Sequence, residues 1–169
     1  MALSLRSLQA ADVESIDAIL RANRPVFSDT ECRTAVSMIR EGLAYPADED
    51  PYQFLVAELD GRVAGYACFG SVALTQGAYD LYWIAVAPEL RGRGVGRALL
   101  ERVEQIVREQ SGQLLVAETS GRADYEPARR FYEQVVRWER CGTIRDFYRP
   151  GDDKVLYVRH LQSSEEPPR

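Results

Sequence analysis

Apolar residues recur in the first third of the chain at two spacings, one typical of strands and one of helices. A short stretch alternates apolar and polar side chains, as a half-buried strand does, and two stretches with helical spacing follow. In the second helix, Ser28 or Asp29 is the expected N-cap and Gly42 the expected terminator. This part predicts a strand at 2–9 and helices at 11–24 and 28–45.

The rest of the chain is richer in β-type patterns. Asp60-Gly61 is a strong hairpin signal between two apolar, β-rich stretches. Pro127 suits the first turn of a helix, and the apolar residues after it keep helical spacing. The remaining expected elements are strands at 52–59, 62–74, 78–86, 112–120, about 138–147 and about 153–161, and helices at 95–110 and from 127 onward.

The predicted order is β-α-α-β-β-β-α-β-α-β-β, which indicates the mixed α/β class. A length of 169 residues with 46% apolar content is enough for one sizeable core. We therefore expect one domain over residues 1–161 and a flexible tail over 162–169.

Charge and cysteine usage exclude several classes of function. Lys and Arg number 21 against 26 Asp and Glu, and the net charge of -5 argues against a general binder of nucleic acid or anionic membrane. Cys32, Cys68 and Cys141 stand far apart, and His160 is the only histidine, so we expect no metal site and no His-based triad. The first residues lack a leader pattern and no apolar segment is long enough to span a membrane, so we expect a cytoplasmic protein.

Three glycines alternate with other residues in Arg91-Gly92-Arg93-Gly94-Val95-Gly96-Arg97, between a predicted strand and the helix at 95–110. At a helix start, about four N–H groups lack internal partners, and residues without Cβ let an anion come close to them. Directed N–H bonds to a charged acceptor contribute about 1.5 to 3 kcal/mol each, against roughly 0.3 to 1 from the helix dipole, so we expect the arginines only to assist. The loop predicts a phosphate site.

Two common nucleotide-binding loops do not match this pattern. A Walker A loop needs Gly-Lys-Ser/Thr, but Gly96 is followed by Arg97 and Ala98. A dinucleotide fingerprint needs GxGxxG close to the first strand, whereas this GxGxG lies in the middle of the chain. The remaining alternative is that the glycines only permit a tight turn, but one glycine would suffice for that.

The stretch from Trp83 to Leu100 resembles the acyl-CoA signature of the GNAT superfamily of N-acetyltransferases. Arg91, Gly94 and Gly96 match its core pattern, and Ala128 with Tyr132 resembles the family's second motif. The resemblance spans roughly residues 3–161 and agrees with the element order. Two features depart from the family: Tyr125 stands where Asn is usual, and Arg137-Trp138 only loosely echoes a usual Gly-Phe.

The resemblance implies a mixed, mostly antiparallel sheet of about seven strands flanked by about four helices. It also implies transfer of an acetyl group from acetyl-CoA to a primary amine of a small molecule, amino acid or peptide, by direct attack in a ternary complex, in a monomer or homodimer. Cys68 and Cys141 have no neighbour that would activate a thiol, so we expect no acyl-cysteine. The alternative is a non-catalytic acyl-CoA-binding or regulatory module of the same fold.

Candidate residues follow from the chemistry and the resemblance together. An alkyl ammonium must lose a proton before it attacks, and Glu118, Asp80 and Tyr82 are the candidates to remove it. Tyr132 matches the family's usual acid, and Tyr148 is the second candidate for that role. Asp80 and Tyr82 are also assigned to the acceptor, which the acidic loop Asp48, Glu49 and Asp50 could attract. The resemblance assigns the cofactor to Ile84, Ala85, Val86, Arg91, Gly92, Arg93, Gly94, Val95, Gly96, Arg97 and Ala128.

Overall fold

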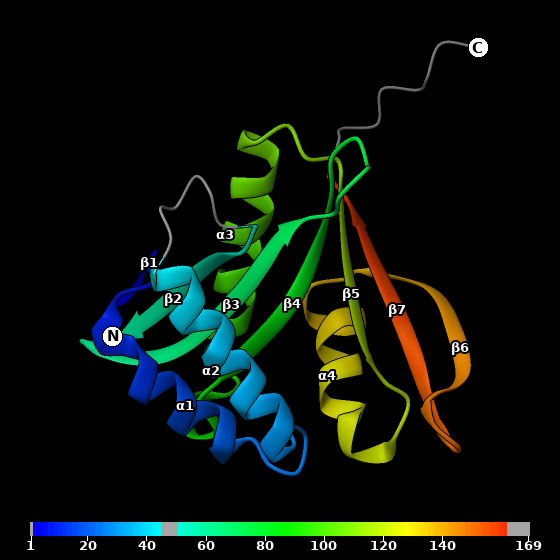
Figure 1. Ribbon diagram of the computed structural model, residues 1–169, viewed down its shortest axis with the longest axis horizontal. Helices are drawn as coiled ribbons and strands as arrows, with labels where there is room; N and C mark the ends of the chain where they lie inside the picture. The colour runs from blue at the N-terminus through cyan, green and yellow to red at the C-terminus, as the bar shows by residue number, and fades with distance from the viewer. Residues whose placement is uncertain (1, 45–50, 162–169) are drawn as a thin grey trace.

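The computed structural model describes residues 2–44 and 51–161, which form a seven-stranded sheet with helices on both faces (Figure 1). The strand order is β1-β2-β3-β4-β5-β7-β6, in which only β4 and β5 pair in parallel. The strands are β1 (Leu3–Ser7), β2 (Gln53–Leu59), β3 (Arg62–Ser71), β4 (Ala78–Val86), β5 (Leu114–Ser120), β6 (Glu139–Arg149) and β7 (Asp152–His160).

Four α-helices cover the sheet: α1 (Val13–Ala22), α2 (Asp29–Ala44), α3 (Val95–Glu109) and α4 (Glu126–Arg130). Ile16 of α1 and Ile39 of α2 are fully buried in one cluster with side chains of β2, β3 and β4. On the opposite face, Leu99 and Val103 of α3 belong to a second cluster that reaches to Tyr157 of β7. The expected mixed sheet, the strand and helix numbers and the element order are therefore confirmed.

Two helix predictions were wrong in detail. The second helix runs through Gly42 to Ala44, although glycine in a helix interior costs about 1 kcal/mol relative to alanine. Its start agrees with the prediction, since the Ser28 hydroxyl and the Glu31 carboxylate form a reciprocal capping box. The segment after Pro127 is not one α-helix, because α4 ends at Arg130 and a π-helical turn, η4 (Phe131–Val135), follows. The tail at 162–169 and the acidic loop of Asp48, Glu49 and Asp50 lie outside the described residues.

The parallel strands β4 and β5 diverge along their length. They pair only from Ala78 to Leu81, opposite Leu114 to Ala117. On the other side of β4, Cys68 pairs with Trp83 and Phe69 pairs with Leu81, which leaves Tyr82 as one extra residue in β4. Because such a bulge bends its strand, β4 turns away from β5 at this point. The sheet therefore opens between Tyr82–Val86 and Glu118–Ser120.

In Figure 1, helices pack on one half of the front face of the sheet and not on the other. The helices α1 and α2 lie over β2, β3 and β4, where the second half of the core forms. No helix of the described residues lies in front of β7 and β6 in this view. The opening between β4 and β5 therefore lies between a part of this face that α1 and α2 cover and a part that no helix of the described residues covers.

Candidate active site

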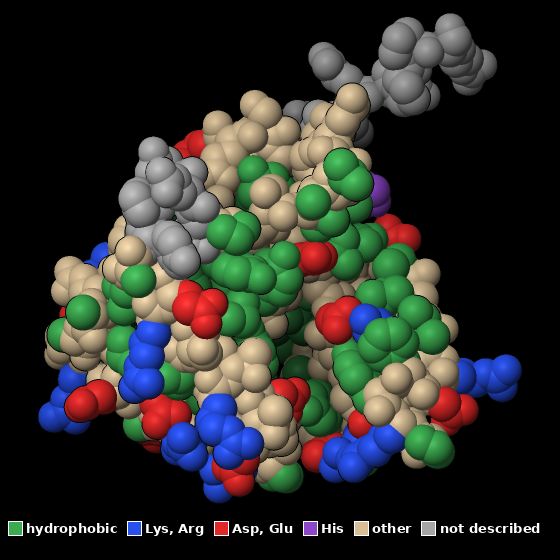
Figure 2. Space-filling model, viewed as in Figure 1, with side chains coloured by type: hydrophobic (Ala, Val, Ile, Leu, Met, Phe, Trp, Pro, Cys, Tyr) green, Lys and Arg blue, Asp and Glu red, His purple; other side chains and the backbone are tan. Residues whose placement is uncertain are grey.

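A cleft of about 1430 Å³ occupies the opening between the diverging strands. Its wall includes Tyr82–Val86 of β4, Glu118–Ser120 of β5 and the turn before α3. Figure 2 shows the molecule hollowed between the α1–α2 side and the β6–β7 side. Because β5 does not pair with Tyr82–Val86, this stretch of β4 turns an unpaired backbone edge toward the cleft.

The glycine turn enters the cleft where α3 begins. Gly92 and Gly94 have φ values of 75° and 83°, in the left-handed region where side chains cause strain, and no atom lies within 4 Å of where either Cβ would stand. Gly94 is the N-cap of α3, and the first intrahelical hydrogen bond runs from the Ala98 N–H to the Gly94 carbonyl. No side chain of the described residues caps this end. The N–H groups of Val95 and its next neighbours therefore stand at an open helix start.

Gly96 differs from Gly92 and Gly94 because the space beside it is filled by other side chains. A Cβ there would lie 3.1 Å from Cε2 of Phe131 and 3.6 Å from Cγ2 of Val86. The missing side chain lets Phe131 of the π-helical turn rest against the first turn of α3. Gly96 thus fixes the position of the segment that carries Tyr132.

Two arginines of the turn have partners within the protein. The Arg91 guanidinium donates to Oδ1 of Asn23, whose amide nitrogen in turn donates to the Val86 carbonyl over 3.1 Å. Arg97 donates to the Val135 carbonyl over 2.8 Å. Through these hydrogen bonds, Asn23 connects the end of α1, the end of β4 and the glycine turn. No short sequence motif predicts this connection. Groups of the protein itself therefore orient both arginine side chains.

Glu118 projects from β5 at the point where the strands separate. Lys154 lies with Nζ 2.5 Å from its Oε2, and the Tyr148 hydroxyl donates to its Oε1 over 3.3 Å. Burial raises the pKa of the nearby Asp80 carboxyl, the negative charge of Glu118 raises it further, and Lys154 lowers it. Burial also raises the pKa of Tyr148, as does the negative charge of Glu118. Carboxylates of β4 and β5, an ammonium and a phenol therefore lie near one another, and two of these residues, Glu118 and Tyr148, line the cleft.

Tyr132 lies in the π-helical turn with 5% of its surface exposed. Its ring stacks on Tyr157 with centroids 5.0 Å apart and contacts Trp138 at 5.6 Å. Burial raises the pKa of the Tyr132 hydroxyl, so the group keeps its proton at neutral pH. Tyr132 belongs at the same time to the aromatic core and to the cleft wall.

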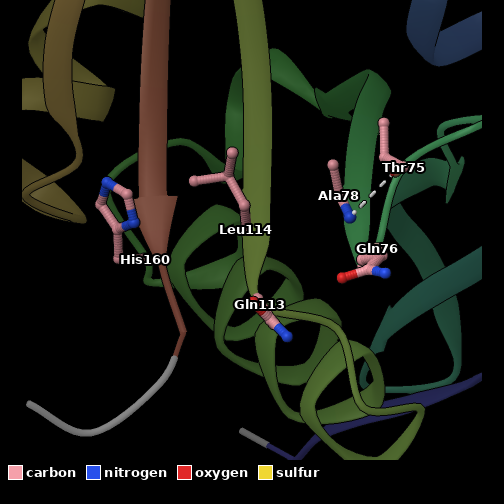
Figure 3. Close-up of a pocket in the computed structure, with 7 residues that line it drawn as sticks. Thr75, Gln76, Ala78, Gln113, Leu114 and His160 are labelled. Atoms are coloured by element: carbon pink, nitrogen blue, oxygen red, sulfur yellow. Dashed lines mark hydrogen bonds between the residues drawn. The ribbon is translucent and has the colours of Figure 1, made fainter. Parts of the chain in front are cut away.

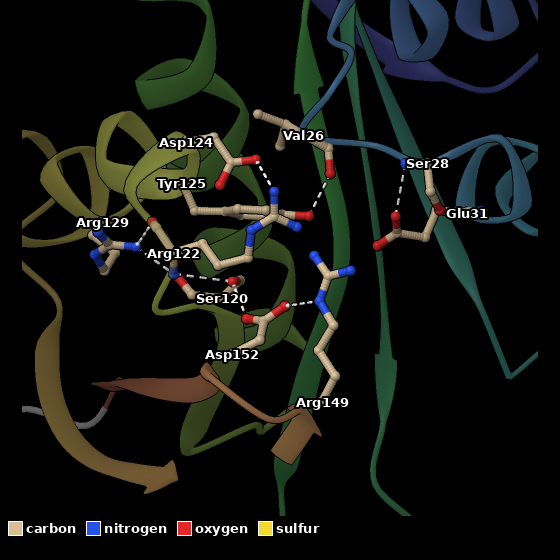
Figure 4. Close-up of polar contacts among 10 residues, drawn as sticks. All are labelled: Val26, Ser28, Glu31, Ser120, Arg122, Asp124, Tyr125, Arg129, Arg149 and Asp152. Carbon is tan, nitrogen blue, oxygen red and sulfur yellow. Dashed lines mark hydrogen bonds and ion pairs between the residues drawn. The ribbon is translucent and has the colours of Figure 1, made fainter. Parts of the chain in front are cut away.

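The two sides of the cleft are tied together by Tyr125, the residue that departs from the family pattern. Its hydroxyl donates to the Val26 carbonyl in the segment between α1 and α2 (Figure 4). Burial raises the pKa of Tyr125 to about 12, so this donor stays protonated. Ser120, at the end of β5, donates to the buried carboxylate of Asp152, and Arg129 donates to the Ser120 carbonyl over 2.6 Å. The end of β5 and the start of α4 are therefore held by polar contacts.

Most of the candidate residues line this one cleft. They are Tyr82, Ile84, Ala85, Val86, Arg91, Gly92, Gly94, Val95, Gly96, Arg97, Glu118, Ala128, Tyr132 and Tyr148. Asp80 and Arg93 are not part of its wall in the described residues. Asn23, Tyr52 and Trp83 line the cleft too and were not among the candidates. Asn23 and Tyr52 come from segments distant in sequence, which spacing alone could not bring to the site.

A second pocket lies at the other end of β4 and β5, where the strands still pair (Figure 3). It measures about 320 Å³ and is lined by Thr75, Gln76, Gly77, Ala78, Gln113, Leu114 and His160. His160 is exposed at the end of β7. This small pocket lies at the end of β4 away from the glycine turn, and none of the candidate residues lines it.

Two further kinds of feature are absent from the described residues. None of their helices is both long and apolar enough to cross a membrane. No three side chains of His, Cys, Asp or Glu in the described ranges converge in a way that could hold a metal ion.

Comparisons with known proteins agree with the geometry. The model of the acetyltransferase (GNAT) family matches residues 15–136. An uncharacterized N-acetyltransferase of Methanocaldococcus jannaschii is 33% identical over 118 residues, which cover 69% of this chain and 72% of that protein. A solved structure assigned to the GNAT family from Desulfovibrio desulfuricans is 39% identical, with a TM-score of 0.89 over 95% of this chain and 100% of that one.

A third comparison concerns the fold alone. A Salmonella typhimurium protein solved with its cofactor acetyl-CoA is 19% identical, with a TM-score of 0.73 over 99% of each chain.

The family model covers well over half of the chain, and the glycine turn that the resemblance singled out lies inside the matched range. The chain therefore belongs to the GNAT family of acetyltransferases.

Proposed function

We propose that this acetyltransferase transfers an acetyl group from acetyl-CoA to a primary amine by direct attack of the amine in a ternary complex. The observation that carries the proposal is the arrangement of one cleft. The open helix start and the diverging strands share it, with a carboxylate at the point of divergence. An anion site, a channel and a proton acceptor in a single cavity are what such a transfer needs.

The residues of the cleft fit acetyl-CoA. Gly92 and Gly94 leave space beside the N–H groups at the start of α3, which suits a diphosphate. The unpaired edge of Tyr82–Val86 suits the amides of the pantetheine arm, which can bond to a strand edge as an added strand does. When bound, acetyl-CoA supplies an acetyl thioester whose carbonyl carbon accepts the amine. Family resemblance assigns N–H groups near Ile84 to Val86 as donors to the carbonyl oxygen.

Glu118 is our candidate for removing the proton from the amine. Its carboxylate lines the cleft, and its two oxygens are already oriented by Lys154 and Tyr148. Asp80 lies outside the cleft wall in the described residues, which supports Glu118 over it for direct contact. Tyr82 lines the cleft and remains a route through water.

Tyr132 is our candidate for donating a proton to the departing thiolate. It matches the family motif, lines the cleft beside Ala128, and its pKa is raised by burial, so it carries the proton to be given. Tyr148 is the second candidate, but its hydroxyl proton is directed to Glu118 over 3.3 Å. That hydrogen bond supports a role for Tyr148 beside the base.

The acceptor is proposed as a primary amine of a small molecule or peptide. The cleft side beside Glu118 carries Tyr52 and Tyr82, whose rings meet edge to face at 5.1 Å. An aromatic wall next to a carboxylate suits a cationic amine with an apolar body.

Free-thiol release from acetyl-CoA over a panel of amines, amino acids and N-terminal peptides tests the proposal. We expect saturable release with at least one acceptor, and its loss in Gly94→Val. Tight binding of acetyl-CoA with no release on any amine would instead favour the non-catalytic acyl-CoA-binding module.

A further inference from the structure

Lys154 is the only lysine in the chain, since the other basic residues among the 21 Lys and Arg are all arginines. It lies in a row of side chains, which we call the cross-strand row, that runs over four neighbouring strands. The row consists of Asp80 on β4, Glu118 on β5, Lys154 on β7 and Phe147 on β6. Residues two apart in a strand share a face, and the registers Asp80 to Val116 and Glu118 to Leu156 therefore put the first three on one face.

The ammonium of Lys154 is held between a ring and a carboxylate. Its Nζ is 3.7 Å from the centroid of the Phe147 ring and 2.5 Å from Oε2 of Glu118. The Lys154 side chain is only 13% exposed, whereas that of Glu118 is 49% exposed. A cation at this distance over an aromatic face is attracted by it, so Phe147 and Glu118 both hold the Lys154 ammonium.

The residue type at this position differs from the rest of the chain. An ammonium is a compact point charge, whereas a guanidinium is a planar fork. Every other basic position in the chain is arginine, and the exception is the position that contacts Glu118.

Several charged or titratable groups face this ion pair. Asp80 lies on the same face, Tyr148 donates to the other oxygen of Glu118, and Tyr82 adjoins Asp80. Two carboxylates, Asp80 and Glu118, therefore lie near one ammonium on one face of the sheet. Burial and the charge of Glu118 both raise the pKa of Asp80, and Lys154 opposes them.

We propose that Lys154 is a positioning residue whose ammonium fixes the orientation of the Glu118 carboxylate. The inference rests on the proposed function, in which Glu118 removes the proton from the acceptor amine. Lys154 itself does not touch the reacting atoms. It acts by holding one oxygen of Glu118, which leaves the remaining lone pairs of the carboxylate directed to the cleft.

The first test compares kcat and the acetyl-CoA Kd of Lys154→Met, Lys154→Arg and the wild type. Without the ammonium, Glu118 loses the contact that orients it, so we expect kcat to fall by about 10-fold, less than the roughly 10²- to 10⁴-fold effect of losing a general base, while the Kd stays the same. Lys154→Arg keeps the charge and should recover part of kcat. Arg145→Gln, on the exposed part of β6, removes one charge without touching Glu118 and should leave kcat unchanged.

The second test uses the fact that a single lysine gives a single signal. Protein grown with lysine labelled with ¹³C at Cε should show the Lys154 Hε protons upfield of free lysine, because they lie over the Phe147 ring. Phe147→Leu should remove this displacement, and Glu118→Gln should change it. An Hε signal at the free-lysine position in the wild type would overturn the proposal.

The two proposals fail in different ways. Absence of turnover by the wild type on every amine would remove the proposed function. Turnover by the wild type together with an unchanged kcat in Lys154→Met would remove the role of Lys154 and leave the proposed function standing.

Discussion

Gly94→Ala separates the backbone cost of the glycine turn from its effect on the cofactor. Gly94 has φ 83° and ψ 0°, and an added Cβ would find no protein atom within 4 Å. The substitution therefore costs only the left-handed backbone strain, about 1 to 2 kcal/mol. For a chain of this size that corresponds to a melting temperature lower by about 2 to 8 °C.

Gly61→Ala is the matched control for this strain. Gly61 has φ 79° and also has open space around the added Cβ, but it lies in the turn between β2 and β3, away from the cleft. We expect Gly61→Ala to lose a similar amount of stability as Gly94→Ala. Any difference between the two variants in cofactor affinity then comes from the position of the methyl group.

The methyl group at Gly94 would stand where the diphosphate approaches the helix start. Losing one N–H bond to a charged acceptor costs about 1.5 to 3 kcal/mol, which weakens binding by about 10- to 150-fold. Calorimetric titration with acetyl-CoA measures the Kd, and thermal unfolding measures the stability. Equal Kd values for Gly94→Ala and Gly61→Ala, after both fold, would refute the assignment of the phosphate site.

Three further predictions follow from the cleft and the fold. Glu118→Gln should lower kcat, measured by thiol release, by about 10²- to 10⁴-fold and leave the acetyl-CoA Kd, measured by titration, unchanged. Full turnover by this variant would mean that another group is the base. Tyr132→Phe should lower kcat more than Tyr148→Phe at saturating substrates, and the reverse order would exchange their roles. The Arg6 guanidinium lowers the pKa of the buried Asp12 carboxyl, so Asp12 stabilises the fold above about pH 4 and this contribution is lost as pH falls further. Asp12→Asn should therefore be less stable than wild type to urea at pH 7 but close to it at pH 2, and a pH-independent difference would contradict this.

The sequence predicts most of the fold because apolar spacing records which face of each element is buried. The strands and helices lie within a few residues of their expected positions, and the Asp60-Gly61 turn joins β2 to β3 as predicted. Gly42 was misjudged because packing of α2 against α1 and the sheet keeps the helix going past a poor helix former. The π-helical turn at Phe131–Val135 carries no local signal, since its residues also have α-helical spacing.

The conformation of the glycine turn follows from the residue types alone. Gly92 and Gly94 adopt the left-handed conformation that their residue type favours. The role of Gly96 depends on the approach of Phe131, a residue 35 positions away, which spacing does not report. The same applies to the bond from Tyr125 to Val26, which are 99 positions apart. Long-range contacts of this kind decide which side chains face the cleft.

The extra residue Tyr82 in β4 could not be predicted from the sequence, although it decides whether the sheet opens. The stretch Leu81–Val86 looks like any buried strand, and the bulge exists only in the register with β3. Without it, β4 would continue beside β5 and the cleft would close. The chemistry of the site therefore depends on a pairing that only the folded sheet displays.

A crystal structure of the protein grown with acetyl-CoA tests the central claim most directly. We predict that the diphosphate oxygens lie about 2.7 to 3.2 Å from N–H groups at the start of α3, with the thioester in the opening between β4 and β5 near Glu118. A diphosphate bound elsewhere, for example in the small pocket beside His160, would contradict the account.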